Sequence, residues 1–260
     1  MRIALSVSYD GASFCGFQSQ PSKCGVQDAL ELSISIIAQQ RIRLFAAGRT
    51  DTGVHAMCQI VHFDTTCLRP LSAWIRGVNA HLPSSVRIEW AKIVEIDFHA
   101  RYSAFSRSYQ YLLYNSPVAP AIMASKAGWF HSPLDVDAMI TAAAYLKGEH
   151  DFSAFRASEC QAKTPVKQLY KAELIAKNQY IIFNFSANAF LQHQVRNMIG
   201  ALIYIGKGAF PPDYMQDLLQ KRDRTLSPPT FSACGLYLTG VGYEAKWGLP
   251  CTQKSIQLLI

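Results

Sequence analysis

The sequence predicts an α+β fold made of two α+β halves, with a mixed, largely antiparallel central sheet and a cleft between the halves. The chain has 260 residues, of which half are apolar and 12% aromatic; this is ample for a buried core and excludes a disordered chain. Segments with strand-like alternation and segments with helical spacing of apolar residues occur in both halves. Because the order of elements in residues 1–100 is loosely repeated in residues 101–260, these two ranges are the predicted halves.

The first half begins with a strand and continues through a loop into a helix. Residues 2–9 alternate apolar and polar side chains, as a half-buried strand does. A loop rich in Gly, Ser and aromatic residues follows, and residues 26–39 carry apolar side chains at helical spacing. The other elements predicted in this half are strands at 41–45, 59–63 and 86–96 and a helix at 71–82.

The second half contains a hairpin and the longest predicted helix. Residues 168–176 and 180–186 have strand character on either side of Lys177-Asn178-Gln179, which predicts a hairpin. The other elements predicted here are strands at 108–114 and 235–241 and helices at 135–146, 190–205 and 214–220.

Charge and hydropathy exclude some classes of protein. Lys and Arg number 25 against 18 Asp and Glu, a net charge of +7 at pH 7. This basic excess favours a polyanionic partner, with nucleic acid first and an anionic membrane surface second. No apolar run reaches the roughly 20 residues that span a bilayer, and the first residues lack the layout of a signal peptide. A soluble, cytoplasmic protein with no membrane partner is expected.

The seven cysteines are scattered along the chain, at positions 15, 24, 58, 67, 160, 234 and 251. Their number is odd, and no Cys-x-x-Cys pair or neighbouring histidine pair has the spacing of metal ligands. We therefore expect reduced thiols, with neither a zinc site nor a disulfide framework.

The segment richest in chemically reactive groups is the loop Ala47-Gly48-Arg49-Thr50-Asp51-Thr52-Gly53-Val54-His55. Its two glycines allow backbone torsions that other residues avoid, so the loop can present Asp51 and Arg49 as an oriented pair. The alternative is an ordinary hairpin connection in which Asp51 bonds its own backbone. Composition alone gives the two interpretations similar weight.

Two tyrosines, Tyr109 and Tyr111, alternate on one face of the strand predicted at 108–114. Alternating tyrosines usually mark a sheet face that packs beneath another layer. The functional alternative is an aromatic platform on which a base stacks.

The helix predicted at 190–205 carries polar residues near its start, where helical spacing brings Gln192, Arg196 and Asn197 together. Its buried stripe is predicted to contain Leu191, Val195, Met198 and Leu202. An isolated arginine is usually a solvated surface charge, whereas an arginine pressed among apolar neighbours needs an anion. Arg196 is therefore a candidate partner for an anion.

The irregular segment 148–165 mixes aromatic and basic side chains. One interpretation is a solvated loop. The other is a set of phosphate contacts made by Arg156, Lys163 and Lys167, which would position an RNA without reading its sequence.

Together these segments resemble the tRNA pseudouridine synthase A family over nearly the whole chain. The loop from Gly48 to His55 fits the family's catalytic motif, Tyr109 stands where its active-site tyrosine does, and Phe190-Leu191-x-His193-x-Val195-Arg196-Asn197 matches the segment that holds its active-site arginine. Segments 15–20 and 150–152 are further landmarks. Two departures are Phe17, where Trp is frequent, and segment 231–236, which replaces a stretch richer in Ala and Pro and bears on the shape of the uracil pocket.

The resemblance implies isomerisation of uridine to pseudouridine in the anticodon stem-loop of tRNA, at positions 38 to 40. The uracil is detached from the ribose, turned and rejoined through C5 without redox change, so no cofactor and no metal are expected. The resemblance makes Asp51 the nucleophile, on C1′ of the ribose or C6 of the uracil, with Arg196 favouring its charged form. Tyr109 would stack on the extruded uracil, and Arg49 would fill the vacated space or grip a phosphate. It also implies a homodimer.

Two other classes of function compete with this interpretation. A non-catalytic RNA-binding or RNA-folding protein would account for the charge and the aromatic residues equally well. A nucleoside hydrolase also uses a carboxylate at a glycosidic bond, but usually in a denser acidic or metal-binding site than the surroundings of Asp51 provide. The sequence favours the isomerase.

Overall fold

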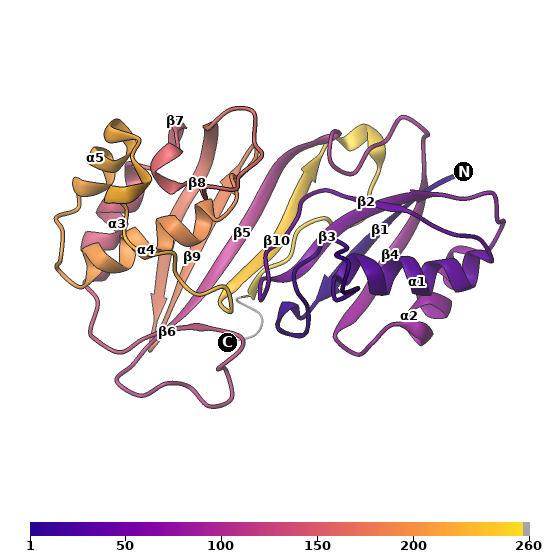
Figure 1. Cartoon of the computed structure of the whole chain (residues 1–260), viewed down its shortest axis with the longest axis horizontal. Coiled ribbons are helices and arrows are strands. Elements are labelled where there is room, and N and C mark those ends of the chain that lie inside the picture. The colour runs from indigo at the N-terminus through magenta and orange to yellow at the C-terminus, as the bar shows by residue number, and fades with distance from the viewer. Residues whose placement is uncertain (257–260) are drawn as a thin grey trace. The chain divides into compact units, whose positions relative to one another are not determined.

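In the computed structural model, which describes residues 1–256, the chain forms two compact units (Figure 1). Unit 1 contains Met1–Ser106 and the segment from Tyr237, and unit 2 contains Arg107–Leu236. These units differ from the expected halves in one main respect, because the end of the chain returns to unit 1. There β10 (Leu236–Tyr243) pairs in parallel with β3 (His55–Asp64).

Unit 1 is built on a mixed sheet with the strand order β4-β1-β3-β10. The first strand, β1 (Arg2–Tyr9), pairs antiparallel with both β3 and β4 (Val86–Val94), and the short β2 (Leu44–Ala46) also pairs antiparallel with β3. The alternation predicted for residues 2–9 is confirmed, since the strand places Ile3, Leu5 and Val7 in the core.

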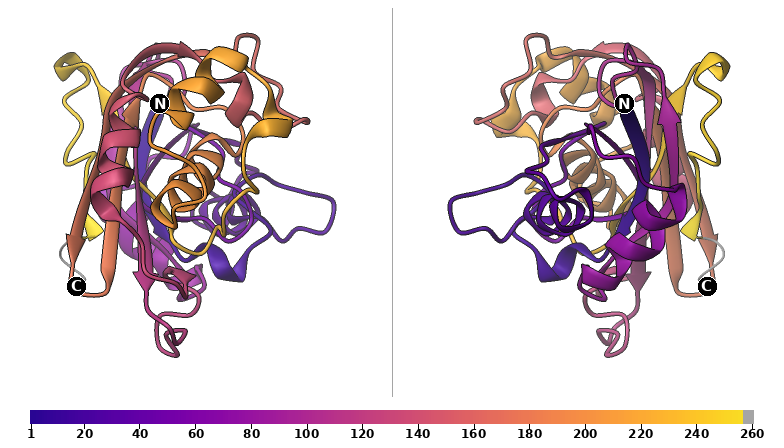
Figure 2. Two further views of the ribbon diagram at one scale, coloured as in Figure 1. Left: turned by 90° about the vertical axis from the view of Figure 1, so that its left-hand side faces the viewer. Right: turned by 90° about the vertical axis from the view of Figure 1, so that its right-hand side faces the viewer.

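Helices α1 (Val26–Ala38) and α2 (Val78–His81) belong to unit 1 and lie beside each other (Figure 1). The helix predicted at 26–39 is confirmed, with Leu30 and Ile34 fully buried. The helix predicted at 71–82 consists of a π-helical turn (Ala73–Gly77) that leads directly into α2. On the face of the sheet opposite α1, the segment after β10 runs back along the unit (yellow in Figure 2), where Trp247 meets Phe98 edge-on at 5.3 Å between ring centroids.

One disulfide bond joins Cys15 to Cys24 in the loop before α1, so the expectation that every thiol is reduced is wrong. The Cys15 N–H donates to the Cys24 carbonyl at 3.0 Å, which brings the two Cα atoms within 5.4 Å. This single local bridge is no framework, and the spacing alone did not reveal it because it depends on how the loop folds back. Cys58, Cys67, Cys160, Cys234 and Cys251 take no part in this disulfide bond.

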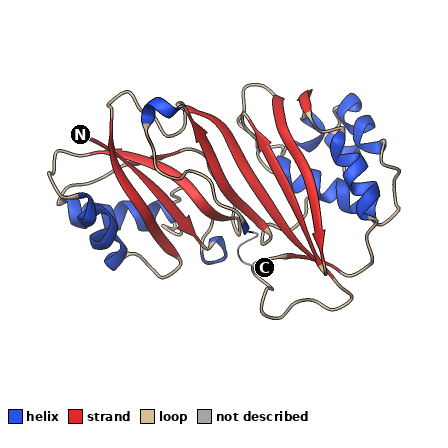
Figure 3. Ribbon diagram, turned by 180° about the vertical axis from the view of Figure 1, so that it is seen from behind, coloured by secondary structure: helices blue, strands red, loops and turns tan. Residues whose placement is uncertain are grey.

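Unit 2 is built on strands in the order β5-β9-β8-β7, all antiparallel to their neighbours. Figure 3 shows its strands in red and its helices in blue. The predicted hairpin is confirmed as β8 (Val166–Lys177) and β9 (Tyr180–Ala187), and β5 spans Ala104–Asn115. Two short strands were not predicted: β6 (Gly128–Phe130), which pairs in parallel with β5, and β7 (Gly148–Asp151).

Three helices complete unit 2: α3 (Val136–Ala144), α4 (Gln194–Gly206) and α5 (Tyr214–Lys221). Most residues of α4 are buried, including the predicted Val195, Met198 and Leu202, and α3 packs on both α4 and α5. The prediction that this helix starts at residue 190 is wrong. His193 has a φ of +62°, outside the helical region, so Gln192 precedes the helix and does not share its face with Arg196.

The α+β class and the mixed, mostly antiparallel strand pairing are confirmed in both units. Within residues 1–256, no helix combines the length and the apolar character needed to cross a bilayer.

Candidate active site

The loop that carries Asp51 connects β2 to β3 in unit 1. The Ala47 N–H donates to the Ile60 carbonyl at 2.8 Å, which continues the pairing of the two strands into the loop. The Val54 N–H donates to the Asp51 carbonyl at 3.1 Å and closes a turn. Gly53 lies in this turn with a φ of +79°, a conformation that glycine adopts without strain. The turn leaves the Asp51 side chain half-buried and the neighbouring Arg49 exposed.

Three hydrogen bonds from other segments of unit 1 hold the backbone and a hydroxyl of this loop. The Phe17 N–H donates to the Thr50 carbonyl at 3.0 Å, and the Gln59 side-chain amide donates to the Gly48 carbonyl at 2.8 Å. The Tyr9 hydroxyl lies 2.8 Å from Thr50 Oγ1, in a buried position. Burial raises the pKa of Tyr9 to about 12, so its phenol keeps its proton at neutral pH.

The loop before α1 packs directly on the backbone of the Asp51 loop. Gly16, with a φ of +96°, lies so close that a Cβ there would be 2.9 Å from the Thr50 carbonyl oxygen. A side chain at position 16 would therefore push the two loops apart. Glycine is required here by contact as well as by conformation.

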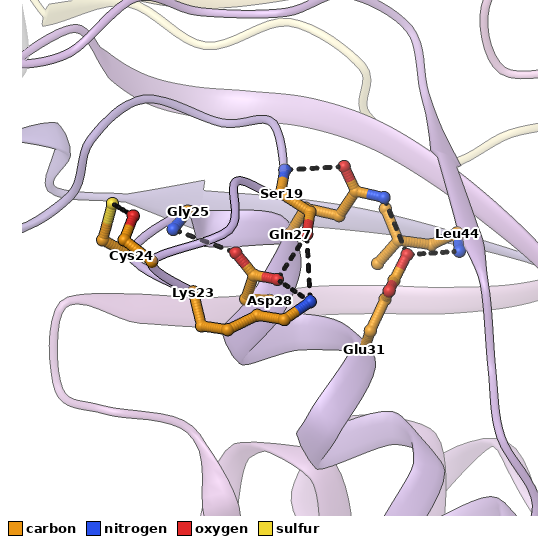
Figure 4. A network of polar contacts seen from close by, with 9 residues as sticks. Ser19, Lys23, Cys24, Gly25, Gln27, Asp28, Glu31 and Leu44 are labelled. Atoms are coloured by element: carbon orange, nitrogen blue, oxygen red, sulfur yellow. Dashed lines mark hydrogen bonds and ion pairs between the residues drawn. The ribbon is translucent and has the colours of Figure 1, made fainter.

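Asp28 anchors the same loop to the start of α1 (Figure 4). Its carboxylate accepts from the Ser19 hydroxyl at 2.6 Å and from the Gly25 N–H at 3.1 Å, and Lys23 lies 3.4 Å away. The loop that packs on the Asp51 loop is thus fixed to α1 by the Asp28 carboxylate. This carboxylate lies in the first turn of the helix, where its negative charge interacts favourably with the helix dipole.

In unit 2, Arg196 is held on the first turn of α4. Its Nε donates to the Phe231 carbonyl at 2.9 Å, while the Phe231 N–H donates to the Arg196 carbonyl at 3.2 Å. The side chain is half-buried.

The next residue, Asn197, is almost fully buried and joins three segments of unit 2. Its amide NH₂ donates to the Phe155 carbonyl at 2.7 Å. Its amide oxygen accepts from the Thr230 hydroxyl at 2.6 Å and from Arg224 at 3.2 Å. Asn197 therefore fixes the start of α4 to both flanking loops.

The two alternating tyrosines have different surroundings. Tyr111 is fully buried and donates to the Ser232 carbonyl at 3.0 Å, so the structural interpretation holds for it. Tyr109 is only half-buried and meets Phe190 edge-on at 5.2 Å between ring centroids. Tyr109 remains the candidate for stacking.

The basic residues of segment 156–167 also differ from one another. Arg156 is half-buried, and one of its terminal nitrogens donates to the carbonyls of Cys160 and Ala162 at 2.7 and 3.0 Å. Lys163 is exposed. Lys167 is buried and donates to the carbonyls of Thr164 and Val166, so its predicted phosphate contact is wrong. Burial lowers the pKa of Lys167.

Unit 1 thus carries Asp51 and Arg49 in one loop, and unit 2 carries Tyr109, Arg196, Arg156 and Lys163. Sequence reasoning missed two residues that support the Asp51 loop, Tyr9 and Gln59, and it named Asn197 beside Arg196 without its supporting role. The sequence could have indicated such a supporting residue by a polar side chain among core positions, as in Cys58-Gln59-Ile60. In residues 1–256, no group of three or more His, Cys, Asp or Glu side chains is arranged to hold a metal ion.

A family model described as tRNA pseudouridine synthase matches residues 5–103 and 142–244, which include both the Asp51 loop and α4. The chain belongs to the tRNA pseudouridine synthase family. It is 62% identical over 258 residues to tRNA pseudouridine synthase A of Methylobacillus flagellatus, covering 99% of each chain. It is 55% identical over 250 residues to the protein of that name from Thiobacillus denitrificans, covering 96% of each.

Among solved structures, the chain is similar to an archaeal box H/ACA sRNP Nop10–Cbf5 complex. The identity is 11% and the TM-score 0.38, with 77% of this chain and 44% of that chain covered. A similarity this weak establishes no relationship between the two proteins. Membership of the family rests on the family model and on the close relatives.

Proposed function

We propose that this chain converts uridine to pseudouridine in the anticodon stem-loop of tRNA, at positions 38 to 40, with Asp51 as the nucleophile. The observation that carries the proposal is the Asp51 loop, in which a half-buried carboxylate stands on a backbone held at several points by other segments. A carboxylate fixed in this way is suited to nucleophilic attack. Membership of the tRNA pseudouridine synthase family supplies the substrate class.

The other candidate residues take the following roles in the proposal. Arg196 is the catalytic arginine of the proposal, and its position on a helix turn that is hydrogen-bonded to Phe231 suits it to a fixed orientation. Tyr109, which is only half-buried, stacks on the extruded uracil. Arg49 replaces the extruded nucleotide in the stem or grips its phosphate. Arg156 and Lys163 contact phosphates, and Lys163 has the greater exposure for this role.

The reaction proposed is an isomerisation. The bond between the uracil N1 and the ribose C1′ breaks, a bond from C5 to C1′ forms, and the C5 proton is finally lost while N1 gains one. These changes balance without an oxidant or a cofactor. We also propose, from the resemblance to the family, that the enzyme acts in the cytoplasm as a homodimer.

The experiment replaces the nucleophile by Asp51→Asn, which keeps the size of the side chain and removes its charge. A tRNA transcript with uridine at positions 38 to 40 is incubated with each enzyme, and pseudouridine is mapped by carbodiimide modification and primer extension. We expect no pseudouridine with the variant, while its Kd for the tRNA stays within about twofold of the unmodified chain.

The matched control is Asp137→Ala, which removes an exposed aspartate from α3 of unit 2 and should leave the product unchanged. Pseudouridine formation by the Asp51→Asn variant would show that Asp51 is not the nucleophile. Tight tRNA binding with no product from the unmodified chain would favour the alternative, a non-catalytic RNA-binding protein.

A further inference from the structure

Unit 1 carries a row of aromatic rings at its surface that lies outside the Asp51 loop. Phe45 of β2 packs at 5.2 Å on the buried His62 and at 5.6 Å on His99, and the His99 ring lies 4.4 Å from Tyr102, measured between centroids. Phe45 is 40% exposed and Tyr102 is 77% exposed. We call Phe45, His99 and Tyr102 the aromatic row.

The backbone presents Tyr102 on an ordered turn. The His99 N–H donates to the Ser103 hydroxyl and the Ser103 N–H to the His99 carbonyl, both at 2.9 Å. The backbone N–H groups of Arg101 and Tyr102 donate to His99 Nδ1 at 3.1 and 3.3 Å. None of these hydrogen bonds involves an atom of the Tyr102 side chain. The turn therefore presents the phenol ring at the surface without depending on that ring for its hydrogen bonds.

The rings of the row are neutral, and its charge lies at the two ends. Burial lowers the pKa of His62 to about 4 and also lowers the pKa of His99, so both imidazoles are uncharged at pH 7. The guanidinium carbon of Arg43 lies 5.6 Å from the Phe45 ring centroid, and that of Arg101 lies 5.7 Å from the Tyr102 ring centroid. Both arginines are exposed.

Neutral, exposed rings with a cation at each end match the chemistry of an unpaired nucleotide. A base stacks on an aromatic face, while an arginine contacts the adjoining phosphate. An apolar partner would make no use of the exposed guanidinium groups, and a pure phosphate site would not need the rings. Ordering of the row before binding reduces the entropy lost when a base stacks on it.

We propose that the aromatic row, together with Arg43 and Arg101, binds an unpaired nucleotide of the RNA substrate by stacking and phosphate contact. The inference rests on the proposed function for the identity of that RNA as tRNA. It adds a contact that is separate from the Asp51 loop and therefore acts on binding of the tRNA.

The first test measures the Kd of a fluorescein-labelled tRNA transcript at fixed salt. Tyr102→Ala should raise the Kd by about tenfold, the loss expected for one stacked base, whereas Tyr102→Phe keeps the ring and should stay within about twofold. Tyr170→Ala, at a 52% exposed tyrosine of β8 in unit 2, is the matched control and should bind as the unmodified chain does. Arg43→Gln should reduce the slope of log Kd against log salt by about one.

A second measurement locates the contact directly. A transcript containing 4-thiouridine is crosslinked by light to the unmodified chain, and the tryptic peptides are identified by mass spectrometry. We expect a crosslink in peptide 102–107, which trypsin releases by cleaving after Arg101 and Arg107.

Several results would overturn the inference. One is an unchanged Kd for Tyr102→Ala, and another is crosslinks confined to other peptides. A change of sedimentation coefficient in Tyr102→Ala with an unchanged Kd would assign the row to a contact between copies of the chain. None of these results affects the product assay for Asp51, so failure of the inference is distinguishable from failure of the proposed function.

Discussion

The loop that carries Asp51 in unit 1 and the turn that carries Arg196 in unit 2 are supported in opposite ways. The Asp51 loop has little regular structure and is held at separate points by Tyr9, Phe17 and Gln59. Arg196 lies on a helix, and the start of that helix is fixed to its surroundings largely through the buried amide of Asn197. Support is therefore distributed in unit 1 and concentrated in unit 2. Single substitutions should accordingly have small effects in the first region and a large effect in the second.

The largest expected effect is that of Asn197→Ala. The substitution removes three hydrogen bonds and leaves the Phe155 carbonyl, which faces the buried amide, without its donor. Loss of buried hydrogen bonds that leaves polar groups unsatisfied should lower the free energy of unfolding by about 3 kcal/mol. Urea denaturation, monitored by circular dichroism, measures this free energy for the variant and the unmodified chain.

The control for this prediction is Asn188→Ala, because Asn188 is an exposed asparagine whose side chain accepts from the Gln168 and Ala189 N–H groups. Asn188→Ala should lower the free energy of unfolding by clearly less, about 0.5–1 kcal/mol, because water can take the place of the lost side chain as hydrogen-bond partner. Equal losses for the two variants would mean that support at the start of α4 is not concentrated in Asn197.

An intermediate effect is expected when the Cys15–Cys24 bond is removed. The bond closes a loop of ten residues, with a sequence separation of 9, and the chain-entropy model gives about 2.5 kcal/mol for such a loop. Cys24→Ser should lower the free energy of unfolding by this amount under non-reducing conditions. Because Tyr9 and Gln59 still hold the Asp51 loop, the rate of pseudouridine formation per folded molecule should change by less than about threefold.

Dithiothreitol provides the control for this second prediction. It should lower the stability of the unmodified chain to that of Cys24→Ser and leave the variant unaffected. Seven reactive thiols in the denatured, unreduced chain would contradict the bond itself, and a large loss of rate would show that support of the Asp51 loop depends on one point.

The same contrast explains which features the sequence predicted. Residues 2–9 and the hairpin at 168–186 were predicted because alternation is local and survives packing. The Asp51 loop was found because its reactive groups are contiguous. Arg196 and Tyr109 were singled out by short motifs, and their roles remain predictions.

Features that depend on contacts between distant segments were missed. The Cys15–Cys24 bond, the return of the chain end through β10 and the supports from Tyr9 and Gln59 all need a folded chain before the partners meet. The start of α4 was misplaced for a related reason. Residues 190–193 have helical spacing, but the left-handed conformation of His193 prevents the helix from starting before Gln194, and composition does not encode that torsion.

The smallest expected effect is that of Tyr9→Phe, which removes one of the distributed supports of the Asp51 loop. The hydroxyl lies 2.8 Å from Thr50 Oγ1, and its loss should lower the free energy of unfolding by about 1 kcal/mol. A double-mutant cycle with Thr50→Val should return a coupling of about 0.5–1 kcal/mol. A coupling near zero would mean that the two hydroxyls do not support each other.

The pH dependence of Tyr9→Phe tests whether the Tyr9 phenol is buried beside Thr50 in the folded chain. Burial raises the pKa of Tyr9 from 10.0 to about 12, so the unfolded chain loses this proton at lower pH than the folded chain does. The stability contributed by the protonated phenol is therefore fully present below pH 10 and is lost as the pH rises toward 12. The difference in stability between the unmodified chain and Tyr9→Phe should be constant from pH 6 to 9 and shrink above pH 10. A difference that stays constant to pH 12 would mean that the folded chain does not hold the Tyr9 phenol in a buried position beside Thr50.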